Sequence, residues 1–74
     1  MEDLFWTTIP IDGKQSEYHI IFEDEVYRFI PKESSMATYN FRREHDEWQA
    51  LDDQSEKILD IAEEALEKYL MRQH

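Results

Sequence analysis

A chain of 74 residues supports one domain, and its 18 acidic against 8 basic residues give it a net charge of −10. The absence of cysteine excludes disulfides, thiolate metal sites and cysteine nucleophiles. Because no apolar run approaches the roughly 20 residues of a membrane span, and because the negative charge repels nucleic-acid phosphates, we expect a cytoplasmic domain that binds neither membranes nor nucleic acids.

The first predicted element is a hairpin of two strands, Leu4–Ile11 and Lys14–Phe22. The pair Asp12-Gly13 between them favours a two-residue type I′ turn, which needs a positive φ at both central positions. Because Pro10 cannot donate a hydrogen bond to a neighbouring strand, we expect the first strand at an edge of the sheet.

The register of this hairpin decides which side chains share a face of the sheet. Pairing outward from the turn places Trp6 opposite His19 and Leu4 opposite Ile21. These four side chains are therefore expected on one face, together with alternate residues of the strands that follow.

The third predicted strand, Val26–Pro31, follows the acidic turn residues Glu23, Asp24 and Glu25. A two-residue loop at either Glu23-Asp24 or Asp24-Glu25 assigns the same faces to the flanking strands. A three-residue turn would exchange the faces, so the predicted faces depend on this loop length.

Alternating hydrophobicity then predicts a fourth strand, Ala37–Arg43, and a short fifth strand, Trp48–Leu51. From Asp53 onward the apolar period changes from 2 to 3.6, which is typical of an amphipathic helix. Either Asp53 or Ser55 can serve as its N-cap. The apolar stripe of this helix comprises Ile58, Leu59, Ala62, Ala65, Leu66, Tyr69 and Leu70.

These elements predict an α+β fold, in which an antiparallel β-meander of four to five strands carries one C-terminal α-helix on one face. Residues 1–74 form a single predicted domain, with the sheet in 1–51 and the helix in 52–74. The more apolar face should meet the helix, because burying it removes the most apolar surface from water. Its members are Phe5, Ile9, Ile11, Tyr18, Ile20, Phe22, Tyr27, Phe29, Tyr39, Phe41 and Trp48.

The opposite face of the sheet is the candidate binding site. A solvated sheet face is normally polar, yet this one combines a tryptophan, aliphatic side chains and two arginines, and tryptophan and arginine are enriched at binding hot spots. Alternatively, the arginines pair with Glu17, Glu23 or helix carboxylates and lie over apolar atoms. The candidate binding residues are Trp6, His19, Ile21, Arg28 and Arg42, with Ile30 on the same face and Leu4 and Val26 at its margin.

No pattern in the sequence supports catalysis or a metal site. The consecutive residues His45, Asp46 and Glu47 cannot all point at one ion, and the acidic run 23–25 lacks the alternating ligands of a calcium loop. The serines lack a nucleophile motif, and a single glycine cannot build a phosphate-binding loop. We therefore predict no enzyme activity, no cofactor and no bound metal.

We expect a small acidic, non-catalytic protein-interaction module, whose partner is an unknown protein or a second copy in a weak homodimer. The alternative is an acidic decoy or inhibitor that mimics nucleic acid and occupies a basic nucleic-acid-binding protein. Lys57 and Lys68 interrupt the negative stripe along the helix, which weakens this alternative. A ligand-binding protein or a small enzyme would instead need a pocket between the helix and the sheet.

Overall fold

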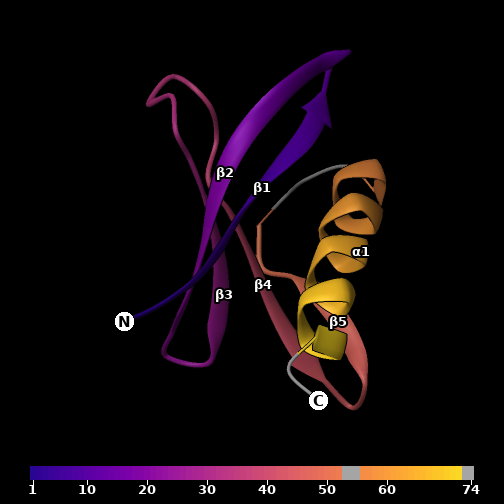
Figure 1. Cartoon of the computed structure of the whole chain (residues 1–74). Coiled ribbons are helices and arrows are strands. Elements are labelled where there is room, and N and C mark those ends of the chain that lie inside the picture. Colours follow the sequence, from indigo (N-terminus) through magenta and orange to yellow (C-terminus); the bar gives the residue numbers. More distant parts are fainter. Residues whose placement is uncertain (53–55, 73–74) are drawn as a thin grey trace.

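A meander of antiparallel strands with a helix across one face makes up the part of the chain that the structure describes, residues 1–52 and 56–72 of a computed structural model. This is the predicted α+β fold, and the described residues form all five strands. The strands lie side by side in chain order, so that each pairs with its neighbour in the sequence (Figure 1). The elements are β1 (Glu2–Ile11), β2 (Lys14–Glu23), β3 (Val26–Pro31), β4 (Tyr39–Glu44), β5 (Glu47–Ala50) and α1 (Glu56–Arg72).

Two-residue turns close three of the hairpins within residues 1–52. The first is the predicted Asp12-Gly13 turn, and the second resolves the acidic loop as Asp24-Glu25. The third, 45–46, joins β4 to β5. All six central residues have positive φ, between 51° and 77°, as a type I′ turn requires. The right-handed twist of the strands favours this turn type strongly enough to hold aspartate, glutamate and histidine in a conformation that suits glycine.

One predicted pairing is wrong, near the start of β1. Asp3, not Leu4, lies opposite Ile21, and the register shifts between Asp3 and Phe5. The shift places Leu4 against the hydrophobic core cluster instead of at the margin of the opposite face. The reason is that Leu4 and Phe5 are adjacent apolar residues, and a bulge lets both contact the core where strict alternation would expose one.

The last two strands of the chain differ from their predicted bounds by one or two residues. β4 begins at Tyr39 instead of Ala37, and the carbonyl oxygen of Ala37 instead accepts a hydrogen bond from the Tyr18 hydroxyl at 2.9 Å. β5 covers Glu47–Ala50, one residue earlier than predicted. The proposed N-caps, Asp53 and Ser55, lie outside the described residues.

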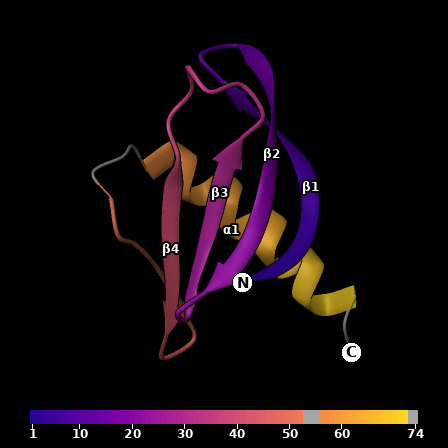
Figure 2. The same cartoon turned by 90° about the vertical axis from the view of Figure 1, so that its left-hand side faces the viewer.

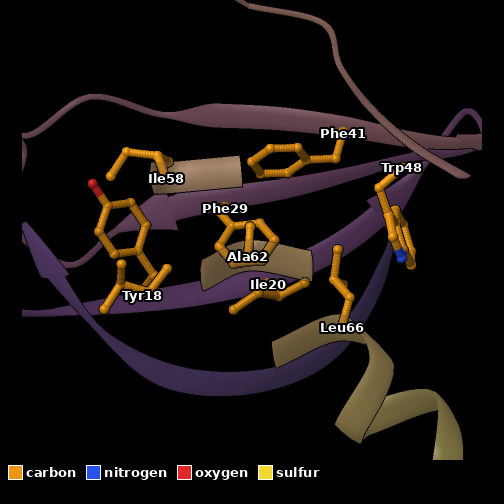
Figure 3. Close-up of a cluster of buried hydrophobic side chains, with 9 residues drawn as sticks. Tyr18, Ile20, Phe29, Phe41, Trp48, Ile58, Ala62 and Leu66 are labelled. Carbon is orange, nitrogen blue, oxygen red and sulfur yellow. The ribbon is translucent and has the colours of Figure 1, made fainter. Parts of the chain in front are cut away.

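The core lies between the sheet and the helix, as predicted. Six sheet residues, Ile9, Tyr18, Ile20, Phe29, Phe41 and Trp48, pack with Ile58, Ala62 and Leu66 of α1. Figure 3 shows the order along the helix: Ile58 lies near Tyr18 at one end, and Leu66 lies near Trp48 at the other. Toward the end of α1, the rings of Phe5 and Tyr69 stack with their centroids 4.8 Å apart.

A polar contact also joins the last strand to the helix. The Trp48 indole Nε1 donates a hydrogen bond to Glu67 Oε1 at 2.8 Å. The Arg43 guanidinium lies 5.5 Å from the centre of the Trp48 ring and 3.9 Å from the same carboxylate oxygen. A buried tryptophan thus keeps its only donor satisfied, and α1 is fixed to the β4–β5 hairpin.

Candidate functional site

The sheet face turned away from α1 carries all five candidate binding residues. Figure 2 looks onto this face, with the strands in front and α1 behind them. Trp6 pairs with His19 and Ile21 pairs with Arg28 across the strands, and Arg42 lies two residues beyond Asn40, the partner of Arg28. We call this surface the uncovered face, since no described element packs over it in either cartoon.

One end of the uncovered face presents an apolar stripe across three strands. Trp6 of β1, His19 of β2 and Ile30 of β3 are successive cross-strand partners, and we call them the Trp6 stripe. The Trp6 and His19 rings are stacked almost parallel, at an interplanar angle of 4° and a centroid distance of 4.6 Å. Even so, Trp6 is 58% exposed and Ile30 37%. A large aromatic surface therefore faces water in a fixed orientation.

The acidic side chain of Asp3 contacts His19, the middle residue of the Trp6 stripe. His19 Nε2 lies 3.2 Å from Asp3 Oδ1, a contact that follows from the register shift placing Asp3 opposite Ile21. The sequence prediction missed Asp3 because strict alternation put Leu4 in that position. The adjacent apolar residues Leu4 and Phe5 were the signal of a bulge that could have revealed it.

The arginine half of the same face, formed by Ile21, Val26, Arg28 and Arg42, is organised differently. Ile21 and Val26 are only 3% and 7% exposed, although α1 packs on the other side of the sheet. The Arg28 guanidinium donates to Asn40 Oδ1 at 3.2 Å through Nη1, and its Nε lies 3.6 Å from Glu23 Oε1. This is the arrangement in which a long basic side chain pairs locally and shields apolar neighbours.

The remaining polar groups near the arginine half are also partly engaged within the chain. Asp52 Oδ2 accepts hydrogen bonds from the Asn40 backbone N–H at 2.7 Å and from its side-chain Nδ2 at 2.9 Å. Arg42 is half-buried, and its Nε has no hydrogen-bond partner among residues 1–52 and 56–72. Arg28 Nε likewise makes no hydrogen bond among the described residues. Glu17, an expected partner of the arginines, instead pairs with Lys32 at 3.2 Å. The two ends of the uncovered face thus differ: Arg28 and Asn40 have partners within the chain at one end, and the other end exposes an aromatic ring.

Shallow hollows flank the strand that carries Trp6. On the uncovered face, Trp6, Thr7, Thr8 and Glu17 line a hollow of about 210 Å³. On the helix side, a second hollow of about 140 Å³ lies between β1 and the end of α1. A further hollow, of about 490 Å³, lies elsewhere, between the start of β2 and the segment after β3, where Lys14 and Lys32 line it.

The titratable groups with altered pKa values belong to the core. Burial, with the neighbouring Tyr39 as a smaller cause, raises the pKa of Tyr18 to about 12. Burial also raises the pKa of Tyr27, against the opposing effect of the Arg43 charge. Both shifts keep a phenol neutral beneath the helix, which is a structural role. Among residues 1–52 and 56–72, no three histidine or carboxylate side chains converge in a way that could hold a metal ion.

The comparisons with known proteins give no further guide to the site. No family model, no curated protein and no solved structure matches this chain. Within the described residues, α1 is too short and too polar to cross a membrane. The function must therefore be argued from the residues of the uncovered face.

Proposed function

We propose that this chain is a non-catalytic protein-interaction module that binds its partner through the Trp6 stripe. The observation that carries the proposal is the 58% exposure of Trp6 in a ring held flat against His19. An exposed tryptophan offers a large apolar area, and stacking restricts its rotation before a partner arrives. A partner that covers it therefore gains the burial free energy with little loss of side-chain entropy.

The contrast between the two halves of the uncovered face supports the Trp6 stripe as the binding site. In the arginine half, Arg28 already contacts Glu23 and Asn40, and Ile21 and Val26 are buried, so a partner would have to displace existing contacts there. The Trp6 stripe requires no such displacement. The net charge of −10 favours a basic partner over a second copy of the chain, which would bring the same charge.

Binders selected from a random peptide display library on the folded domain would provide the test. Calorimetry would then compare their affinity for wild type, for Trp6→Ala and for Met71→Ala. Met71 is 73% exposed on α1, which lies on the other side of the sheet from the uncovered face, and serves as the matched control. We expect Trp6→Ala to weaken binding by about 30-fold, the usual size of a hot-spot loss, and Met71→Ala to leave it unchanged. Binders that ignore Trp6→Ala, or a library that yields none, would contradict the proposal.

The acidic-decoy alternative makes an opposite prediction about salt. A decoy would bind a basic protein through carboxylates of α1, so its affinity would fall steeply with ionic strength and would not depend on Trp6. Two of these carboxylates already have basic neighbours, since Lys68 lies 3.2 Å from Glu64 and Arg43 lies 3.9 Å from Glu67. This local neutralisation favours the interaction-module proposal.

A further inference from the structure

The strand that carries Trp6 is also an open edge of the sheet. β1 pairs only with β2 among the described strands, and it forms the outer margin of the sheet in Figure 2. Ile11 and Lys14 close a two-residue turn, so they form the first doubly hydrogen-bonded pair of the hairpin. The alternation of an antiparallel ladder then directs the backbone groups of Trp6, Thr8 and Pro10 away from β2.

The position of Pro10 agrees with this assignment. A proline has no N–H, and at an outward-facing position it removes no hydrogen bond from the β1–β2 ladder. Pro10 also blocks one end of the edge against a further strand, and the irregularity between Asp3 and Phe5 interrupts the other end. Between Pro10 and this irregularity lies a short uncharged segment, residues 6–8, whose outward N–H and C=O groups are open to pairing.

Hollows on both faces of the sheet meet at this segment. Trp6 and Thr7 line both of them, one on the uncovered face with Glu17 and the other on the helix side with Ala65 and Tyr69. An added strand would project alternate side chains toward the two hollows. Peptide recognition by strand addition uses this combination, in which backbone hydrogen bonds provide affinity and flanking pockets provide specificity.

We propose that β1 receives an extended, basic segment of another protein as a sixth strand alongside residues 6–8. This inference rests on the proposed function and names its partner: a strand in which basic residues face the Trp6 side and apolar residues face the helix side. On the Trp6 side of the edge lie the carboxylates of Asp3 and Glu17, which stay more than half exposed although each already has a neighbour, His19 or Lys32. On the helix side lie the stacked rings of Phe5 and Tyr69 together with Lys68 and Arg72, whose charges disfavour a basic residue there and leave the apolar rings to an apolar one. The charge of −10 makes a basic strand a better occupant than a second copy.

The probe is a synthetic seven-residue peptide of alternating lysine and valine, titrated into the isotope-labelled domain. We expect the amide protons of Trp6 and Thr8 to exchange more slowly when the peptide is bound. Thr8→Pro removes one outward N–H and should weaken binding about tenfold. Thr8→Ala keeps that N–H and removes only a side chain that lines the hollow, so it should weaken binding by no more than about threefold. A peptide with glutamate in place of lysine should bind at least about tenfold more weakly.

A backbone-methylated version of the peptide keeps the test valid if Thr8→Pro fails to fold. Methylating the valine nitrogens in one peptide and the lysine nitrogens in another blocks opposite edges of the strand, so one should lose binding to the wild-type domain while the other retains it. Equal binding by both, together with unprotected β1 amides, would overturn the inference. So would protection of these amides in the concentrated domain alone, because a second copy would then occupy the edge.

These outcomes separate the inference from the proposed function. Binding that is lost in Trp6→Ala but kept in Thr8→Pro would retain the interaction module and exclude strand addition. Binding that is lost in Thr8→Pro but kept in Trp6→Ala would place the interaction at the edge and exclude the Trp6 stripe. If the peptide does not bind at about 1 mM, the limit of a weak specific interaction, the inference is wrong, whatever the display library yields.

Discussion

The two faces of this sheet use aromatic side chains in opposite ways. On the covered face Tyr18, Phe29 and Phe41 are fully buried beneath α1. On the uncovered face the largest aromatic residue, Trp6, lies mostly in water and is held by a single stacked neighbour. Burial of the aromatic side chains on the covered face stabilises the fold, whereas most of the Trp6 surface could still be buried by a partner. If the Trp6 stripe binds a partner as proposed, stability and recognition use opposite sides of the same strands.

The largest expected difference in the free energy of unfolding is between variants of two adjacent residues of β3. Phe29 faces the helix and Ile30 faces water, so the pair samples both faces at one point in the chain. Phe29→Ala should lower the free energy of unfolding by about 3–5 kcal/mol, because it leaves a cavity in the core. Ile30→Ala, the matched control, should lower it by less than about 1 kcal/mol. Urea denaturation followed by circular dichroism measures both free energies. Similar losses in the two variants would show that the uncovered face contributes to stability as much as the covered face.

A smaller effect should appear at alkaline pH. The folded state keeps the Tyr18 proton more tightly than the unfolded chain, since burial raises its pKa from 10.0 to about 12. Its contribution is therefore complete below pH 10 and declines as the pH rises toward 12, by at most about 1.4 kcal/mol per pH unit.

Tyr18→Phe isolates this contribution from that of Tyr27, whose pKa burial also raises. The free energy of unfolding of wild type should fall more steeply than that of Tyr18→Phe between pH 10 and pH 12. Parallel curves would show that Tyr18 ionises as readily in the folded domain as in the unfolded chain.

A modest effect on stability should come from the residue with the largest proposed role in binding. Trp6→Ala removes the stack on His19 and only the minor part of the tryptophan surface that is buried, so the free energy of unfolding should fall by about 1–2 kcal/mol. Thermal denaturation beside the wild-type protein measures the change. A loss as large as that of Phe29→Ala would make Trp6 a structural residue and would remove the basis for the Trp6 stripe.

The fold could be predicted from the sequence because turn residues and hydrophobic periodicity are local signals. The Asp12-Gly13 turn predicted the register from Ile11 to Phe5 correctly, and a two-residue acidic loop kept the predicted faces for β3. The error at Leu4 arose because a bulge depends on what the core can accommodate, which a period of two does not encode. The core face and the apolar stripe of the helix followed from periodicity alone.

The side-chain contacts within the site could not be predicted from these local signals. Stacking of Trp6 on His19 and pairing of Arg28 with Glu23 depend on side-chain rotamers, and several choices are compatible with the same register. The hydrogen bond from Trp48 to Glu67 depends on how α1 crosses the sheet, which a helical period leaves open. The sequence therefore indicated which residues share the uncovered face, but not that Arg28 contacts Glu23 and Asn40 while Trp6 remains exposed.

The chain-order arrangement of the strands also bears on how quickly the domain assembles. Every strand pairs with its neighbour in sequence, and two-residue turns make three of the connections within residues 1–52. Such hairpins form on the microsecond timescale, because little loop entropy is lost when they close. In contrast, α1 must return across a long stretch of sequence to reach β1, where Tyr69 meets Phe5. We infer that docking of α1 sets the folding rate, because it closes a much longer stretch of chain than the two-residue turns do.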